Sequence, residues 1–246
     1  MGKFDNFETI KWCGYEWIKR PLWGDNHPNE DMVWYDQDCA TINSDNHIVL
    51  NIKRNPKTFN VPNRGEVTKE FGRGSVRTTE EFKYGTFEWE MKVPEGKYVW
   101  PALWLSSDFS WPPEIDCMEG WSGDNPLYIK RCLWRNIKPT MHWSENCDDV
   151  NGKHLEETKN NTWRWWLKCT DFDKYKVEWT PKYVDVYYNG HKVKRFNNTE
   201  MLEHMNKPEV KMHVIMSINA YSKFPKYYFD FWPMIVKSFK YTPYEK

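Results

Sequence analysis

Trp111-Pro-Pro-Glu-Ile-Asp-Cys-Met-Glu-Gly-Trp121 places three carboxylic acids close together in one segment. In an extended strand alternate side chains share a face, so Glu114 and Asp116 point the same way. Glu119 lies at an odd spacing from both and would point to the other face. One β-bulge between Asp116 and Glu119 corrects the phase. We therefore expect a bulged strand with all three acids on one face, and with Cys117 and Met118 as bulge and core residues.

Aromatic side chains surround this segment in a chain that is 17% aromatic and holds 16 Trp. Trp111 and Trp121 bracket the acids, and Trp104 and Trp100 precede them. Flat rings beside paired carboxylates suit a sugar, because rings stack on its C–H faces while the acids act on the glycosidic bond. Two alternatives are a solvated acidic strand face and a Ca²⁺ site, although Ca²⁺ usually takes carboxylates from a flexible loop. Each Trp can also be a core residue.

The rest of the chain consists mainly of short alternating runs between turn residues, which indicates an all-β sandwich or barrel. Asn189-Gly190 predicts a hairpin turn. The best helix candidate is 196–207, and the polar stretch 144–163 is expected to be a long loop, either a surface insert or part of a cleft wall. The strands are expected at the following runs: 47–53, 74–78, 84–93, 99–105, 175–180, 184–188, 208–218 and 234–241.

Composition excludes several classes of function. The 35 basic and 35 acidic residues give a net charge of zero, which argues against a nucleic-acid partner. No apolar run approaches the length of a membrane span. The six cysteines form no CxxC pair, so no zinc site is signalled, and whether any of them pair stays open. The N-terminus has no apolar signal-peptide segment. A linker-like tract is absent, so we expect one domain over 1–246.

With these motifs the sequence resembles glycoside hydrolase family 16. Glu114-Ile-Asp-Cys-Met-Glu119 fits the bulged acid signature of that family. The supporting stretches follow in the family's order, and they are Phe82–Lys92, Gly96–Leu105, Thr140-Met-His142 and Tyr175–Pro181 with Tyr188-Asn-Gly190. The resemblance spans roughly 30–241.

The resemblance implies a jelly-roll β-sandwich of two curved antiparallel sheets with an open cleft on the concave face. It also implies endo-acting hydrolysis of β-linked glucans or galactans with retention, in a secreted or cell-surface monomer without a cofactor. By motif position Glu114 is the nucleophile, Glu119 the acid/base and Asp116 the assisting acid. Negative neighbours and desolvation are expected to raise the pKa of Glu119.

Other residues are assigned to the substrate cleft by their place in the sequence. Trp104, Trp111 and Trp121 are expected to bind sugar, with Arg77 and Trp143 as further contacts. His142 either faces the cleft and shares a proton with Asp116 or is a surface histidine. Arg73, Arg77, Arg131 and Arg135 are a candidate local sulfate site.

Two departures from the family pattern matter. Lys237 stands where many members carry an Asp that helps to hold a structural Ca²⁺, so we expect no calcium there. Pro113 stands where a Gly usually precedes the first acid.

The bulged motif favours a β-1,3-glucan or a mixed β-1,3/1,4-glucan as substrate. The alternatives are a sulfated or neutral galactan (agar, porphyran, carrageenan or mucin-type), and a non-catalytic carbohydrate-binding sandwich. The last needs the aromatic residues but no acid triad.

Overall fold

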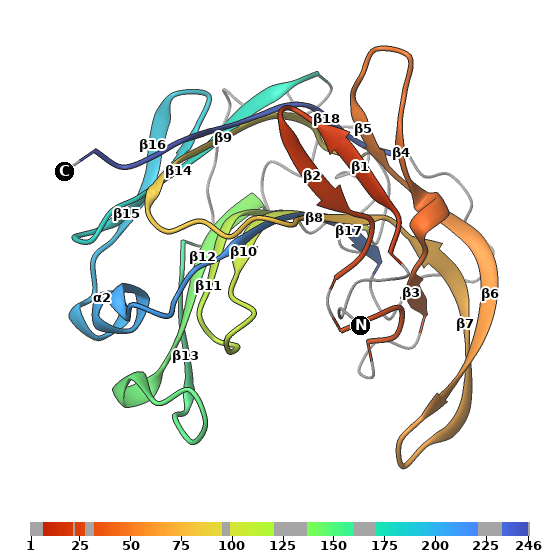
Figure 1. The fold of residues 1–246 in the computed structure, drawn as a ribbon, viewed down its shortest axis with the longest axis horizontal. Helices are drawn as coiled ribbons and strands as arrows, with labels where there is room; N and C mark the ends of the chain where they lie inside the picture. The colour runs from red at the N-terminus through yellow and green to blue at the C-terminus, as the bar shows by residue number, and fades with distance from the viewer. Residues whose placement is uncertain are drawn as a thin grey trace.

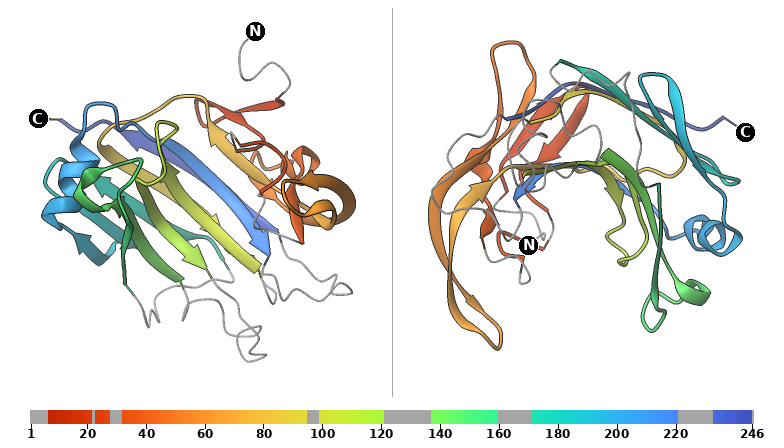
Figure 2. Two further views of the ribbon diagram at one scale, coloured as in Figure 1. Left: turned by 90° about the horizontal axis from the view of Figure 1, so that it is seen from below. Right: turned by 180° about the vertical axis from the view of Figure 1, so that it is seen from behind.

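The computed structural model describes residues 7–21, 23–27, 32–94, 99–120, 137–159, 171–220 and 233–245. Two large antiparallel sheets pack face to face and curve together (Figure 1). Within these described residues, the inner sheet has eight strands and the outer sheet has seven. A smaller sheet carries a long hairpin that projects beyond the sandwich (Figure 2). The predicted β-sandwich is confirmed, and the barrel alternative is wrong.

Strand order within each sheet sets which residues become neighbours. The inner sheet runs β1-β2-β8-β17-β10-β11-β12-β13, and its strands are β1 (Thr9–Trp12), β2 (Tyr15–Ile18), β8 (Ser75–Thr78), β17 (His213–Ala220), β10 (Val99–Ser106), β11 (Glu114–Gly120), β12 (Ile137–Ser144) and β13 (His154–Thr158). The outer sheet runs β16-β15-β14-β9-β18-β5-β4, with β16 (His191–Phe196), β15 (Val184–Tyr188), β14 (Asp173–Trp179), β9 (Gly85–Lys92), β18 (Met234–Thr242), β5 (Ile48–Leu50) and β4 (Ala40–Ile42).

The third sheet and the short helices complete the described chain. The third sheet pairs β3 (Val33–Tyr35) parallel to β7 (Gly65–Arg73), and β7 antiparallel to β6 (Ile52–Val61). The helix α2 (Thr199–Asn206) lies within the predicted 196–207. Asn198 caps its N-terminus, because the Asn198 side chain accepts from the Met201 amide. Two 3₁₀ turns are η1 (Gln37–Cys39) and η3 (Glu145–Cys147). No helix among the residues that the structure describes is long and apolar enough to cross a membrane.

The core lies between the two large sheets. Strand β9 alternates buried and half-buried side chains along its whole length, as the predicted period of two requires. Trp17, Trp89 and Trp179 lie fully within this core. Part of the tryptophan content is thus core packing, the alternative that the composition left open.

Two further expectations have clear outcomes. Asn189 and Gly190 both have positive φ, as a two-residue hairpin turn between β15 and β16 requires.

The prediction that 144–163 is a loop is wrong for His154–Thr158. This segment pairs with β12 and extends the inner sheet, because its backbone satisfies the hydrogen bonds of the β12 edge.

The bulge in β11 is confirmed. Glu119 is opposite Ala102, while Asp116 is opposite Trp104, so the three residues that follow Asp116 face only two on β10. The pairing with β12 shifts at the same place. Ile115, Cys117 and Met118 are all buried in the core. The extra residue thus brings Glu119 back to the face that carries Glu114 and Asp116.

A hydrogen bond from the outer sheet holds this bulge. The Tyr188 hydroxyl of β15 donates to the Cys117 carbonyl at 2.8 Å in a buried setting. A bulged residue leaves the regular ladder of hydrogen bonds, so its carbonyl needs another donor. Tyr188 supplies that donor across the sandwich.

Replacing Tyr188 with phenylalanine is expected to lower the free energy of unfolding by about 1–3 kcal/mol, because the buried Cys117 carbonyl loses its donor. Urea unfolding measures this change. Tyr183→Phe is the matched control, because the Tyr183 hydroxyl donates to Glu178 near the surface. An equal loss in both variants, or none in Tyr188→Phe, would contradict the role of Tyr188 in the bulge.

Candidate active site

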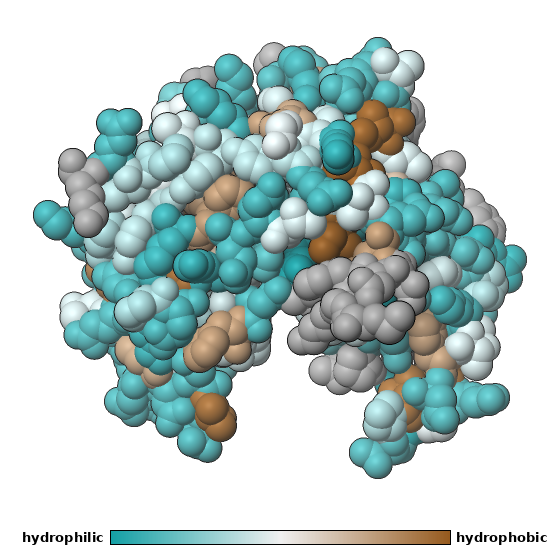
Figure 3. Space-filling view, in the orientation of Figure 1, coloured by the Kyte–Doolittle hydropathy of each residue, from teal (hydrophilic) through white to brown (hydrophobic). Residues whose placement is uncertain are grey.

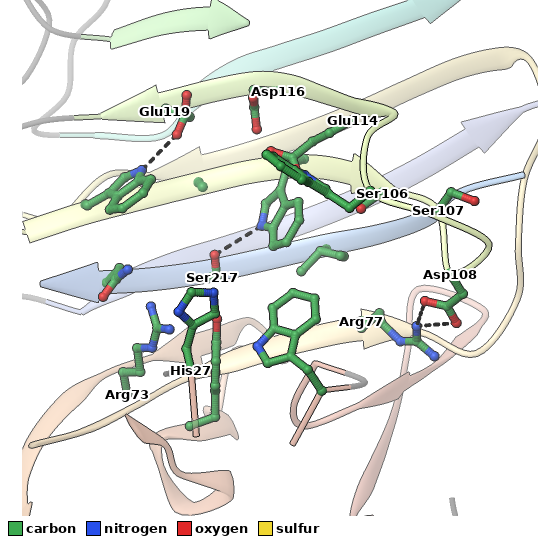
Figure 4. A pocket seen from close by; sticks show the side chains of 18 of the residues that line it. His27, Arg73, Arg77, Ser106, Ser107, Asp108, Glu114, Asp116, Glu119 and Ser217 are labelled. Atoms are coloured by element: carbon green, nitrogen blue, oxygen red, sulfur yellow. Dashed lines mark hydrogen bonds and ion pairs between the residues drawn. The ribbon is translucent and has the colours of Figure 1, made fainter. Parts of the chain in front are cut away.

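The concave face of the inner sheet forms a cleft of about 880 Å³. Figure 3 shows the molecule hollowed between two walls. All three acids of β11 line the cleft, with side chains from β8, β10 and β17. Figure 4 shows Glu114, Asp116 and Glu119 in a row along their strand, directed into this space. The bulge thus produces the predicted arrangement of acids.

Each outer acid of the row accepts a hydrogen bond from a tryptophan. The indole nitrogen of Trp111 donates to Glu114 Oε2 at 2.8 Å, and that of Trp100 donates to Glu119 Oε1 at 3.1 Å. Thr140 Oγ1 also donates to Glu119, over 3.4 Å. These donors fix the position of both carboxyl groups without neutralising them.

Burial raises the pKa of all three acids. The pKa of Glu114 lies well above its usual value because of burial and then the charge of Asp116, with His142 and the Trp111 hydrogen bond acting in the opposite direction. The pKa of Asp116 is likewise well above its usual value, through burial and the charge of Glu119. Burial also raises the pKa of Glu119, and this expected rise therefore has desolvation as its largest cause.

His142 lies beside the acids, on the neighbouring strand β12. It is directly opposite Glu114 in the register, and its Nε2 lies 3.1 Å from Asp116 Oδ2 and 3.9 Å from Glu114 Oε1. The hypothesis that His142 shares a proton with Asp116 therefore has the geometry that it requires. The surface-histidine alternative is wrong, since the side chain is only 12% exposed.

Two of the tryptophans predicted to bind sugar line the cleft. Trp104 lies on β10 and donates from its indole nitrogen to Ser217 Oγ. Trp111 is 54% exposed, and it covers one end of the acid row. Trp121, Arg131 and Arg135 lie outside the described residues, so these three predictions are left as they stand.

Trp143 requires a correction. It is 6% exposed and belongs to the hydrophobic core, not to the cleft. The physical reason is strand alternation: His142 faces the acids, so its neighbour Trp143 points to the opposite side of the sheet. The prediction that Trp143 contacts substrate is therefore wrong.

Arg77 lines the cleft, but its guanidinium group is engaged by protein. Its Nη1 lies 2.6 and 2.8 Å from the two carboxylate oxygens of Asp108, and His213 Nε2 lies 2.9 Å from the same carboxylate. Asp108 belongs to the segment between β10 and β11 that carries Trp111. Arg77 thus anchors the base of that segment, a role that the sequence did not indicate.

Several lining residues escaped the sequence prediction. Trp100 shares a face with Trp104 by alternation along β10, and this pattern was sufficient to identify it. Ser217 and Asn219 follow the same rule on β17. Trp23, His27 and Tyr35 come from a distant part of the chain, and no local pattern connects them to the acids.

Changing Trp100 to phenylalanine is expected to move the alkaline limb of the pH–activity profile to higher pH. The Trp100 hydrogen bond favours the charged form of Glu119 and lowers its pKa, so its loss raises that pKa and keeps the carboxyl protonated further into alkali. The pH dependence of kcat/KM measures this shift. Trp104→Phe is the control, because the Trp104 indole donates to Ser217 instead, and its limb is expected to stay in place. A limb that moves in both variants, or in neither, would refute this coupling.

Comparison with known proteins places the chain in a family. The model of glycosyl hydrolases family 16 matches residues 26–224. The chain belongs to this family. The membership confirms the resemblance inferred from the acid motif and its neighbouring strands.

The individual relatives that match the chain are distant. An endo-1,3-1,4-beta-glycanase of Rhizobium meliloti is 26% identical over 177 residues, which cover 68% of this chain and 34% of that protein. A beta-glucanase of Rhodothermus marinus is 29% identical over 161 residues, or 58% of this chain and 50% of that protein. The chain thus spans a third to a half of the length of these relatives.

The likeness to solved structures concerns the fold. A family 16 endo-glucanase of Bacteroides ovatus superposes with a TM-score of 0.67 at 16% identity, covering 96% of this chain and 97% of that one. This near-complete coverage supports the jelly-roll arrangement of the two large sheets.

Proposed function

We propose that the protein is a retaining, endo-acting glycoside hydrolase that cleaves a β-1,3-glucan or a mixed β-1,3/1,4-glucan. The observation that carries the proposal is the row of Glu114, Asp116 and Glu119 on one face of a bulged strand, in a cleft lined by tryptophan. Family membership and the names of the relatives, which include glycanases and glucanases, support it. The residues 1–246 act as one catalytic domain in this proposal.

The first half of the reaction uses two of the acids. The Glu114 carboxylate attacks the anomeric carbon while Glu119 gives its proton to the leaving glycosidic oxygen. An ester between Glu114 and the sugar forms as the glycosidic bond breaks. His142 and Trp111 favour the charged form of Glu114 that this attack needs. Burial favours the protonated form of Glu119 that the departure of the oxygen needs.

The second half regenerates the enzyme. Esterification removes the negative charge of Glu114, so Glu119 loses a neighbour that opposes its ionisation and can accept a proton from water. The water oxygen then attacks the anomeric carbon, and the ester bond breaks. Two inversions at this carbon give net retention. Asp116, between Glu114 and Glu119 on β11, orients the nucleophile through its hydrogen bond to Glu114.

The cleft also supports an endo mode of attack and a role for stacking. It is open along the concave face, and Trp104 and Trp111 present indole rings beside the acids. Indole faces pack on the C–H surfaces of a sugar, and the desolvated ring area contributes to binding. We further propose that the protein acts as a monomer, secreted or at the cell surface, with polysaccharide as its partner.

A panel of polysaccharides tests the proposal. Reducing ends are expected to appear with laminarin or mixed-linkage glucan, and NMR during the first turnovers is expected to show the β-anomer before mutarotation. Release only from agar, porphyran or carrageenan would replace the glucan with a galactan. Binding without release from any polymer would refute the catalytic reading in favour of a carbohydrate-binding sandwich. Initial release of the α-anomer would refute retention.

A further inference from the structure

Three metal-ligating side chains meet at the rim of the cleft, on the side of His142 that faces away from Asp116. In the pairing of β12 with β13, His142 is opposite Glu156 and Ser144 is opposite His154. His154 and Glu156 are two positions apart, so both side chains lie on the face that carries His142. The register thus gathers two imidazoles and one carboxylate from adjacent strands.

The donor atoms converge closely. His142 Nδ1 lies 2.8 Å from His154 Nε2 and 3.7 Å from Glu156 Oε2, and all three atoms lie within 4.8 Å of one another. Two ligands about 2.0–2.1 Å from a tetrahedral zinc ion are about 3.3 Å apart. The three donors therefore need only small side-chain rotations to share one ion.

The surroundings of His142 match those of a metal ligand. A histidine that binds a metal through one ring nitrogen usually donates its other N–H to a carboxylate, which fixes the tautomer. His142 Nε2 lies 3.1 Å from Asp116 Oδ2, so Nδ1 is the nitrogen that remains for the ion. The centroid of the Trp111 ring lies 4.9 Å from that of the His154 ring, so the two rings are in contact. His154 and Glu156 are themselves exposed, which gives an ion access from solvent.

We propose that His142, His154 and Glu156 bind a divalent transition-metal ion, with Zn²⁺ as the best fit. Two imidazole nitrogens and one carboxylate oxygen form a known three-ligand set for zinc, with the fourth position left to water. Hard cations such as Ca²⁺ and Mg²⁺ prefer oxygen ligands and fit this set poorly. The sequence did not signal the site, because only the pairing of β12 with β13 brings His142 beside His154 and Glu156.

Zinc at this site is linked to the acid row by a single side chain. With the ion on Nδ1, His142 carries its proton on Nε2 and donates it to Asp116. The site is nevertheless separate from the proposed reaction, in which no step uses His154 or Glu156. Its test therefore needs no substrate, and failure of the site leaves the proposed hydrolase activity untouched.

Calorimetric titration of the chelator-treated protein with ZnCl₂ tests the site. We expect one Zn²⁺ per chain, and visible d–d absorption of a four-coordinate ion when Co²⁺ is used instead. Replacement by His154→Gln or Glu156→Gln is expected to weaken Zn²⁺ binding at least about tenfold, because each removes a ligand from the set. Circular dichroism checks that both variants keep the fold.

Two control variants test whether Zn²⁺ binds at other exposed donor groups. His191→Gln removes an exposed histidine of the outer sheet, and Cys13→Ser removes an exposed thiol. Both are expected to bind Zn²⁺ as the unchanged protein does. The proposal is overturned if the unchanged protein takes up no stoichiometric Zn²⁺. It is also overturned if neither ligand variant weakens binding, or if a control variant weakens it as much.

Discussion

Replacing Glu114 with glutamine is expected to lower the hydrolysis rate on a β-glucan by at least about 10⁴-fold, because the variant has no carboxylate to attack the anomeric carbon. The amide keeps the shape of the side chain and can still accept from the Trp111 indole. Reducing-sugar release measures the loss. A variant with unchanged rates would refute the assignment of the nucleophile.

The same variant carries its own control for folding. Burial raises the pKa of Glu114 in the folded state above its unfolded value. The stability that this carboxyl contributes is therefore fully present below the unfolded pKa and is lost as pH rises through the folded pKa. Glutamine never ionises, so Glu114→Gln is expected to have a higher Tm than the unchanged protein at neutral pH, and the difference is expected to shrink in acid. A lower Tm at neutral pH would indicate that misfolding causes the loss of activity.

Glu119→Gln is expected to have the second largest effect, and its size depends on the leaving group. On a glucan the rate is expected to fall about 10²–10⁴-fold, because the departing sugar oxygen no longer receives a proton. On an aryl glycoside with an acidic phenol the departure needs little protonation, so a burst of phenol is expected before slow deglycosylation. If no burst appears, and cleavage of the aryl glycoside slows as much as cleavage of the glucan, the role of Glu119 as acid is contradicted.

Added azide separates the two roles by stereochemistry. In Glu114→Ala, azide takes the place of the nucleophile on the α face, and an activated β-glycoside is expected to give the α-glycosyl azide. In Glu119→Ala, azide attacks the ester already formed on Glu114, and the β-glycosyl azide is expected. NMR of the products distinguishes these outcomes. An exchange of the two products between the variants would reverse the assignment of nucleophile and acid/base.

The acid row shows what the alternation of side chains along a strand can predict from the sequence. Alternation along β11 gave the common face of Glu114 and Asp116, and the odd spacing of Glu119 required a bulge, which the register confirms. The same alternation also determined that Trp143 faces away from His142, although the prediction placed both in the cleft. That error came from applying the period of two to one strand and not to the next.

Contacts between residues far apart in the sequence could not be predicted from such patterns. Arg77 resembled a sugar or sulfate ligand in the sequence, and only the fold brings Asp108 and His213 to its guanidinium group. The stretch 144–163 looked like a loop, because its polar residues gave no sign that β12 offered an edge to pair with. These outcomes depend on which strands become neighbours, and sequence separation hides that information.

The sequence by itself determined the strand-rich class, the bulged acid strand and the family, because each rests on short local motifs and on their order along the chain. The tertiary structure alone decided that Tyr188 holds the Cys117 carbonyl, that Arg77 anchors the segment with Trp111, and that His154 meets His142. The physical reason is that side-chain direction follows from the local backbone period. A contact between strands depends on sheet order and register, which the packing of the whole core sets.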